Sequence, residues 1–150
     1  MTFEEFNSQI NDIKMQHPIW FELLDNNSIT DDMIISVEKE LKITLPEQYI
    51  YFLKKYSGGY FAFTIVLSCN PESDFYIVND YSKSLLEKYK FLPLFDFENG
   101  DLAGVRVHNG KCSEKIFYYL HDTNELDVSD YDFFKATLHY GFDKKSDSPL

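Results

Sequence analysis

The sequence contains only two cysteines, Cys69 and Cys112, and neither has a second Cys or a His at the spacing of a zinc site or a redox CxxC motif. Nothing marks the chain as secreted, so we expect two reduced, partly buried thiols rather than a disulfide. Residues 1–13 are amphipathic and acidic, unlike a secretory signal peptide, and the longest apolar stretch, 60–67, is too short to cross a bilayer. These absences predict a cytoplasmic protein without a structural metal ion.

Basic residues are few: 14 Lys and Arg stand against 25 Asp and Glu, which gives a formal net charge of -11. Such a surface repels phosphate backbones and anionic lipid headgroups, and it attracts basic proteins over a long range. The charge therefore disfavours direct binding to nucleic acid or membranes. It allows a basic protein partner without requiring one, since acidic residues also serve solubility.

The common enzyme motifs are also missing, because the sequence has no Gly-rich phosphate loop, no nucleophile elbow and no HExxH. His121 and Asp122 are adjacent, and we expect neighbours on a strand to point to opposite faces and so not to share a site. The remaining candidate for an unusual enzyme is a carboxylate pair, Asp96 and Asp101. We predict no enzymatic activity, no catalytic residues and no cofactor.

Hydrophobic residues make up 44% of the 150-residue chain and aromatic residues 17%, which is enough for one domain with a substantial core. We expect a single domain over residues 1–142 and a mobile polar tail over 143–150. Helical spacing predicts a first helix after Thr2 that ends at His17-Pro18, and a second helix capped by Thr30. A third helix is expected to begin with Pro46 in its first position and to end at the left-handed pair Gly58-Gly59.

Extended patterns dominate after residue 60. We expect strands at 60–67, 75–78, 91–97, 102–107, 116–120 and 126–128. One helix, 81–90, is expected to be inserted among them, and Ser129 with Asp132 resembles a capping box that opens a last helix ending near Gly141. The order predicts an α+β fold, a mostly antiparallel sheet packed by N-terminal helices, one inserted helix and a C-terminal helix.

Several segments in this order resemble the SUKH superfamily, which includes yeast cell-wall-assembly regulators and many bacterial immunity proteins. The resembling segments are the acidic helix 35–41, Leu45-Pro46 with the aromatic helix after it, Ser57-Gly58-Gly59, Phe91–Leu94 with Gly100-Asp101, Ile116–Tyr119 with His121-Asp122, and Asp132–Phe134. The resemblance covers roughly residues 29–138. Leu120 and the Ser-Gly-Gly turn depart from the usual pattern of the family, in which a bulky aromatic and an Asn-Gly turn are common.

The resemblance implies a non-enzymatic α+β protein that binds and neutralises a cognate toxin, often a nuclease or deaminase with a basic surface. A regulatory adaptor of the same fold is the alternative, and a small enzyme of unrecognised type is the third. Carboxylates beside tyrosines suit contact with a basic partner, because the ring supplies area and the acid supplies direction. The candidate partner-binding residues, at loops and strand ends on the sheet side, are Asp74, Tyr76, Asp80, Tyr81, Asp96, Glu98, Asp101 and Asp122.

Overall fold

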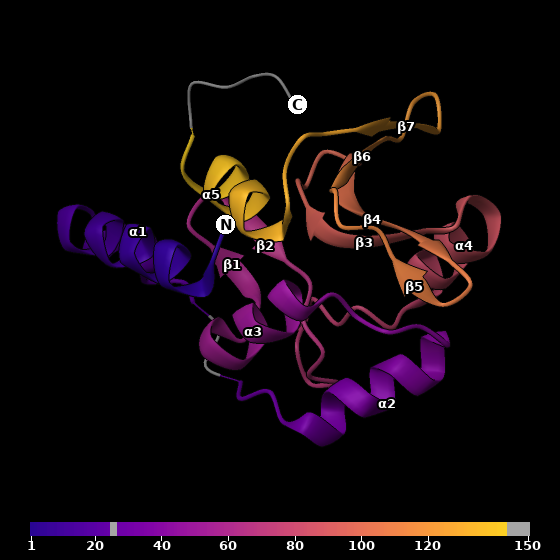
Figure 1. The fold of residues 1–150 in the computed structure, drawn as a ribbon, viewed down its shortest axis with the longest axis horizontal. Helices are drawn as coiled ribbons and strands as arrows, with labels where there is room; N and C mark the ends of the chain where they lie inside the picture. The colour runs from indigo at the N-terminus through magenta and orange to yellow at the C-terminus, as the bar shows by residue number, and fades with distance from the viewer. Residues whose placement is uncertain (25–26, 144–150) are drawn as a thin grey trace.

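The computed structural model of the chain describes residues 1–24 and 27–143, and Figure 1 shows its ribbon. The helices described are α1 (Phe3–Gln16), the short 3-10 helix η1 (Pro18–Phe21), α2 (Asp31–Leu41), α3 (Glu47–Tyr56), α4 (Asp80–Tyr89) and α5 (Phe133–Phe142). The strands are β1 (Gly59–Phe61), β2 (Thr64–Val66), β3 (Phe91–Asp96), β4 (Leu102–His108), β5 (Lys111–Cys112), β6 (Phe117–Leu120) and β7 (Glu125–Val128). The α+β class is confirmed. Of the expected tail, Asp143 is the C-cap of α5, and 144–150 lie outside the described residues.

The first two helices begin where the sequence predicts. Thr2 and Glu5 form a reciprocal capping box, in which the Glu5 N–H donates to Thr2 Oγ1 over 3.1 Å. Thr30 Oγ1 accepts from the Met33 N–H over 3.2 Å at the start of α2. The buried stripe of α2 is Ile34, Val37 and Leu41, as its helical spacing predicts.

Both predicted ends of α3 are one residue or more away from the observed ends. Pro46 has extended backbone angles, φ -60° and ψ 139°, so it is the N-cap and the helix begins at Glu47. The left-handed C-cap is Ser57, at φ 70°, one residue before the predicted pair, and Gly58 and Gly59 continue the turn with positive φ angles of 92° and 78°. Ser68 Oγ donates to the Ser57 carbonyl over 2.9 Å, and this contact from outside the helix holds the unusual backbone.

The expected strand at 60–67 is a hairpin of two short strands, β1 and β2. Ala62 takes a positive φ of 52° at the turn, and the Phe63 N–H donates to the carbonyl of Gly141 near the end of α5. The expected strand at 75–78 is absent, and Tyr76 forms only an isolated bridge with Ser68. The hydrogen bond between Phe63 and Gly141 lies at the point where segment 60–67 is divided into two strands. The local sequence does not indicate this contact, because Gly141 is distant in the chain.

The described strands form one antiparallel sheet in the order β1-β2-β3-β4-β6-β7, with β5 also pairing with β4. One face packs against α1, α3 and α5, where Phe6 and Phe134 stack with ring centroids 4.3 Å apart. The other face packs against α4, where Leu85 contacts a smaller cluster of Phe91, Leu102 and Tyr119. The alternation of side chains along each strand explains the two clusters.

The capping box expected at Ser129 is wrong, and Asp132 caps α5 instead. Asp132 Oδ1 accepts from the Lys135 N–H over 2.8 Å. Ser129 Oγ donates to the Ile116 carbonyl over 2.6 Å and accepts from the Tyr131 N–H over 3.1 Å, so it fastens the segment before the helix. Both residues satisfy backbone groups, but the helix begins three residues later than a box at Ser129 requires.

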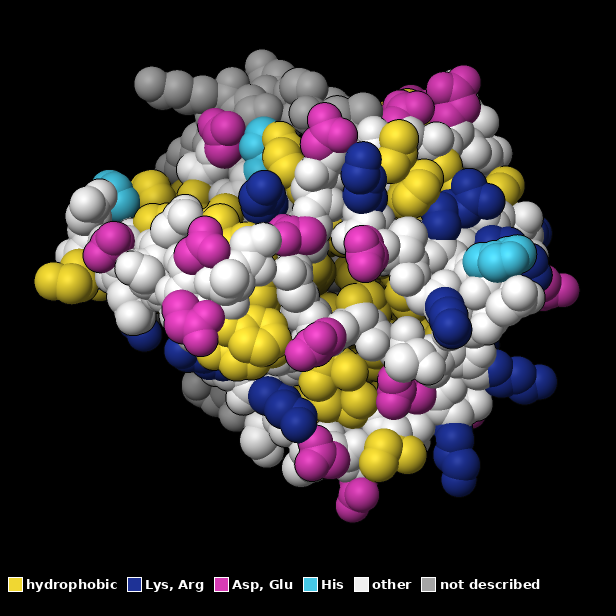
Figure 2. Space-filling model, viewed as in Figure 1, with side chains coloured by type: hydrophobic (Ala, Val, Ile, Leu, Met, Phe, Trp, Pro, Cys, Tyr) yellow, Lys and Arg dark blue, Asp and Glu magenta, His cyan; other side chains and the backbone are white. Residues whose placement is uncertain are grey.

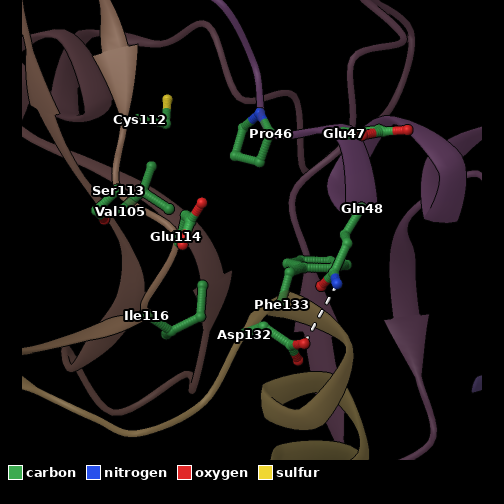
Figure 3. A pocket seen from close by; sticks show the side chains of 10 residues that line it. All are labelled: Pro46, Glu47, Gln48, Val105, Cys112, Ser113, Glu114, Ile116, Asp132 and Phe133. Atoms are coloured by element: carbon green, nitrogen blue, oxygen red, sulfur yellow. Dashed lines mark hydrogen bonds between the residues drawn. The ribbon is translucent and has the colours of Figure 1, made fainter. Parts of the chain in front are cut away.

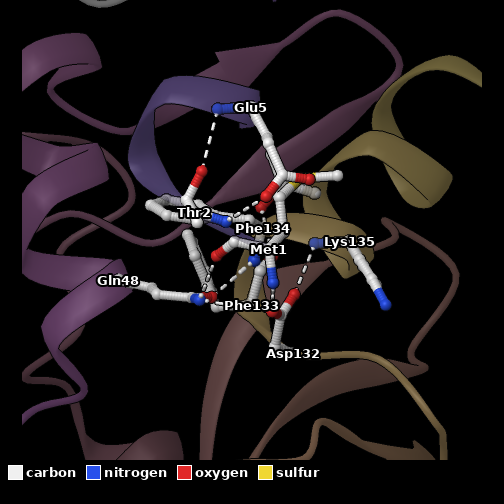
Figure 4. A network of polar contacts seen from close by, with 9 residues as sticks. Met1, Thr2, Glu5, Gln48, Asp132, Phe133, Phe134 and Lys135 are labelled. Atoms are coloured by element: carbon white, nitrogen blue, oxygen red, sulfur yellow. Dashed lines mark hydrogen bonds and ion pairs between the residues drawn. The ribbon is translucent and has the colours of Figure 1, made fainter. Parts of the chain in front are cut away.

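A polar network ties α1, α3 and α5 together at their first turns (Figure 4). The Met1 amino group lies 2.7 Å from Asp132 Oδ2. Gln48 Nε2 donates to the Met1 carbonyl and to Asp132 Oδ2, both over 3.2 Å, while Gln48 Oε1 accepts from the Phe134 N–H over 2.9 Å. Burial acts to raise the pKa of Asp132, but its hydrogen bonds with the Met1 amino group, the Lys135 N–H and Gln48 outweigh burial and lower it.

Replacing Gln48 with alanine is expected to lower the free energy of unfolding by about 1–2 kcal/mol, because Phe134 and Asp132 each lose a partner in a half-buried site. Urea unfolding followed by circular dichroism measures the change. Gln9→Ala, on the exposed face of α1, is the matched control and should lie close to wild type. Equal midpoints for the two variants would show that the network contributes nothing to stability.

Candidate functional site

The turn between β3 and β4 carries three carboxylates, and side-chain hydrogen bonds fix its backbone. Asp96 Oδ1 accepts from the Glu98 N–H over 2.8 Å, and Asn99 Oδ1 accepts from the Asp101 N–H over 2.9 Å. Two successive side-chain turns of this kind hold the loop, and Phe97 within it packs against Tyr118 and Tyr140. Asp96 and Asp101, the expected carboxylate pair, each make a separate set of hydrogen bonds.

Asp101 joins this turn to the turn after β6. Its Oδ1 lies 2.6 Å from His121 Nδ1 and accepts from the His121 N–H over 3.0 Å, and Tyr118 donates to its Oδ2 over 3.4 Å. The hydrogen bond with Asp101 raises the pKa of His121. Burial acts to raise the pKa of Asp101, but the hydrogen bonds from His121 and Tyr118 outweigh it and lower that pKa.

The expectation that His121 and Asp122 point to opposite faces is wrong. His121 Nε2 lies 3.1 Å from Asp122 Oδ1, because both residues lie in the turn beyond the end of β6, where strand alternation no longer applies. Gly100 leaves room for the imidazole, since a Cβ at this position would lie 2.8 Å from the ring. The imidazole is thus held between two carboxylates on an exposed turn.

Replacing Asp101 with asparagine is expected to lower the pKa of His121 toward its ordinary 6.5. The raised pKa of His121 means that its contribution to stability is complete below pH 6.5 and is lost as the pH rises through the folded-state pKa. The lowered pKa of Asp101 means that its contribution is present above pH 3.8 and is lost as the pH falls through the folded-state pKa. The pair therefore stabilises the fold most between these two values.

An NMR titration of the His121 ring in wild type and in Asp101→Asn measures this pKa directly. Asp130→Asn is the matched control, because Asp130 is exposed and follows the end of β7, whereas His121 precedes its start. Asp130 Oδ1 lies 3.6 Å from Lys115 Nζ. An unchanged His121 titration in Asp101→Asn would contradict the contact.

A hollow of about 380 Å³ lies beside the β3–β4 turn, and Asp74 is among the residues that line it. Its aromatic wall is formed by Tyr60 and Phe75, whose rings meet edge to face with centroids 5.2 Å apart. Tyr60 donates to Glu98 Oε2 over 3.4 Å, and the charge of Glu98 raises the pKa of Tyr60. Tyr60 therefore lines the same hollow as Asp74 and also contacts Glu98 of the β3–β4 turn.

The three candidates around the start of α4 lie on other parts of the surface. Tyr81 is 52% exposed and reaches Tyr119, whose pKa is raised by burial and by its neighbours, Tyr81 among them. Asp80 is the exposed first residue of α4. Tyr76 is half-buried beside Ser68, and burial raises its pKa. Of these three, Tyr81 is connected to the β6–β7 hairpin through Tyr119.

Acidic residues gather at one end of the central strands of the sheet, and basic residues gather at the other end. The register places Asp96 beside Leu102, Leu102 beside Tyr119, and Leu120 beside Glu125, so the β3–β4 and β6–β7 turns lie at one end of the sheet. We call this the acidic end, because segments 96–102 and 119–125 contain no Lys or Arg. Its carboxylates are Asp96, Glu98, Asp101, Asp122 and Glu125.

The opposite end of the strands, which we call the basic end, consists of segments 88–91 and 106–115. Its cations are Lys88, Lys90, Arg106, Lys111 and Lys115, and Glu114 is the one carboxylate in these segments. In Figure 2, Asp and Glu side chains gather at the upper right, over the β6–β7 hairpin, while several Lys and Arg side chains lie lower on the right. Sequence reasoning treated the sheet surface as acidic throughout and missed this division.

A separate cleft of about 430 Å³ lies between the starts of α3 and α5 and the segment joining β5 to β6 (Figure 3). Val105, Ile116 and Phe133 give it an apolar lining, and Glu114 points into it, whereas Glu47 turns its carboxylate away. None of the eight candidate residues lines it. Its walls come from four segments that are separate in the sequence, which is why the sequence did not indicate it.

Cys112 also lines this cleft and is half-buried, while Cys69 is fully buried, and both thiols are free as expected. Burial raises the pKa of Cys69 to about 12 and that of Cys112 to about 11, so neither is activated as a nucleophile at neutral pH. Within residues 1–24 and 27–143, no group of His, Cys, Asp or Glu is placed to bind a metal ion. The helices of the same residues are too short or too polar to span a membrane.

The chain matches the profile of a known family. The profile of the SMI1-KNR4 cell-wall family, SUKH_6, matches residues 31–136, from the start of α2 into α5. No curated protein and no solved structure matches the chain. The matched residues cover most of the chain and include the whole sheet, so the chain belongs to the SUKH_6 family of the SUKH superfamily, which includes immunity proteins and is generally non-enzymatic.

Proposed function

We propose that the protein is an immunity protein that binds and neutralises a basic toxin domain, such as a nuclease, inside the producing cell. Membership of the SUKH superfamily supports a protein-binding role. The observation that carries the proposal further is the acidic end, where five carboxylates gather on two adjoining turns without a Lys or Arg among them.

The acidic end suits a basic partner in two ways. Its carboxylates attract such a partner before contact and align it, which raises the association rate. Glu98, Asp122 and Glu125 are exposed, whereas the side chain of Asp101 is only 17% exposed and is held by His121. The exposed carboxylates bind the partner, and Asp101 holds the two turns in register. The protein then covers the cationic surface that a nuclease needs for its own phosphate substrate.

A regulatory adaptor is the second candidate, because the matched family is described by its cell-wall members. The adaptor uses the same acidic end without inhibiting an activity. Stoichiometric inhibition of a single partner separates the two candidates.

The test begins by recovering partners on the tagged protein from lysate of its source cells at low and moderate salt, and identifying them by mass spectrometry. The partner is then purified, and its activity is measured against rising amounts of this protein. We expect one basic partner, bound less tightly at higher salt, whose activity disappears at a one-to-one ratio. A bound partner with undiminished activity would favour the adaptor, and an acidic partner would overturn the proposal.

A further inference from the structure

β7 is the last strand on its side of the sheet in the part of the chain that the structure describes. Its register against β6 pairs Asp127 with Tyr118 and Val128 with Phe117, and the Ser129 N–H donates to the Ile116 carbonyl over 2.9 Å. Alternate residues of an antiparallel strand direct their backbone groups to the same side. Leu126 and Val128 therefore direct their N–H and C=O groups away from β6, toward the open edge.

The two faces of β7 differ in chemistry. Leu126 is half-buried against Tyr119 and Phe117, and Val128 on the same face is 53% exposed. Glu125 and Asp127 alternate with them and lie on the other face. Asp122 precedes the strand and Asp130 follows it, so carboxylates recur throughout residues 122–130, and no Lys or Arg is present there.

The unpaired N–H and C=O groups of an open edge strand can form hydrogen bonds with a further strand. The charged side chains of the edge strand determine which sequences fit as that further strand. A second copy of this chain would set these carboxylates against their own counterparts, which disfavours self-pairing. A strand that alternates Lys or Arg with apolar residues fits both faces, since its cations lie beside Glu125 and Asp127 while its apolar side chains extend the Leu126 and Val128 surface.

We infer that β7 accepts an extended basic segment of the partner as an additional strand, a form of recognition by β-strand addition. This inference rests on the proposed function and specifies how the partner is held. Main-chain hydrogen bonds to Leu126 and Val128 give the contact its direction, and the carboxylates select the basic sequence.

The probe is a short synthetic peptide that alternates lysine and valine, added to the full chain and followed by water-exchange NMR. We expect the Leu126 and Val128 amides to exchange at least about 5-fold more slowly when the peptide is saturating, because they become hydrogen-bonded. A glutamate–valine peptide controls for charge. A lysine–valine peptide with N-methyl groups on its valines has the same charge and side chains but cannot form the ladder with its valines beside Leu126 and Val128. Equal binding of the N-methylated peptide would overturn strand addition.

Two variants locate the contact. Val128→Pro removes one outward N–H without touching the pairing with β6, and Pro is tolerated at such edge positions, so we expect weaker peptide binding in a folded protein. Glu125→Gln with Asp127→Gln is expected to weaken binding about 10-fold. Unchanged binding in both variants would overturn the inference. Glu114→Gln, which lies in the cleft rather than at β7, is the matched control.

The outcomes separate this inference from the proposed function. If the basic toxin binds and is inhibited, but its binding is indifferent to Val128→Pro and leaves the Leu126 and Val128 amides unprotected, the mode of contact is wrong and the function stands. If the peptide pairs with β7 while no toxin is inhibited, the strand site stands and the proposed function is wrong. Sedimentation of the free protein tests self-pairing, for which we expect a monomer.

Discussion

Replacing Gly104 with alanine is expected to lower the free energy of unfolding by about 3–4 kcal/mol, which is a large loss for the addition of one methyl group. A Cβ at this position would lie 2.0 Å from the Leu92 carbonyl oxygen and 2.8 Å from Pro93 Cα. Both contacts are with backbone, which has no rotamer into which it can move. The sheet register is irregular between Pro93 and Phe95, so the bulge in β3 brings its backbone against Gly104.

Chemical unfolding of Gly104→Ala, followed by circular dichroism and Trp20 fluorescence, measures this loss. Gly141→Ala is the matched control: a Cβ there meets Phe61 at an ordinary 3.5 Å, and alanine is the better helix former. We expect the control to be neutral or slightly stabilised. A Gly104→Ala protein as stable as its control would show that β3 and β4 do not approach each other as closely as these distances require.

Reversing three exposed charges of the acidic end, in Glu98→Lys/Asp122→Lys/Glu125→Lys, is expected to weaken binding to the basic partner by about 100-fold or more. Each reversal replaces an attraction with a repulsion, and opposed like charges at an interface cost several kcal/mol in sum. The loss should fall partly on the association rate and shrink as salt rises. Surface plasmon resonance at two salt concentrations measures both rates.

The matched control carries charge reversals at the opposite end of the same strands, in Lys90→Glu/Lys111→Glu. It also alters surface charge on exposed residues but leaves the acidic end intact, so its affinity should remain within a few-fold of wild type. Far-ultraviolet circular dichroism confirms that both variants fold. If the two variants lose affinity equally, the location of the charges does not matter, and the acidic end is not the binding surface.

Local signals in the sequence predicted the elements whose ends are set by their own residues. Thr2 and Thr30 cap their helices through contacts three residues away, and these pairs are visible in the sequence. The ends of α3 and the β1–β2 turn were placed wrongly because partners distant in the chain decide them. Ser68 holds Ser57, and Gly141 accepts from Phe63. No periodicity in the segments themselves carries that information.

In the candidate site, too, the features set by local sequence were predicted, and those set by distant pairing were not. Asp96, Glu98, Asp101 and Asp122 were predicted from their places in turns, and antiparallel pairing brings them to one end of the sheet. Glu125 was not among the candidates, although it directly precedes the strand expected at 126–128, and the structure places it at the start of β7. The sorting of charges could not be predicted without the strand register, because it depends on which turns share an end.

Glu98, Asp101 and Asp122 have different roles in the proposed function. Glu98 and Asp122 each contact one neighbouring ring, Tyr60 and His121 respectively, but both are exposed to a partner. The side chain of Asp101 is only 17% exposed and is engaged by His121 and Tyr118. An Asp101 variant should therefore affect binding through the positions of the turns, and a Glu98 variant through direct contact. The carboxylates that were proposed together as one surface thus comprise contact residues and a positioning residue.

The most direct test of the central claim, that the acidic end binds the basic partner, is a hydrogen–deuterium exchange map of the purified one-to-one complex against the free protein. We expect new protection in the β3–β4 turn, 96–102, and through the β6–β7 hairpin, 119–128. Protection confined to the cleft segments 46–48, 112–116 and 132–133, or to the basic end, would contradict it.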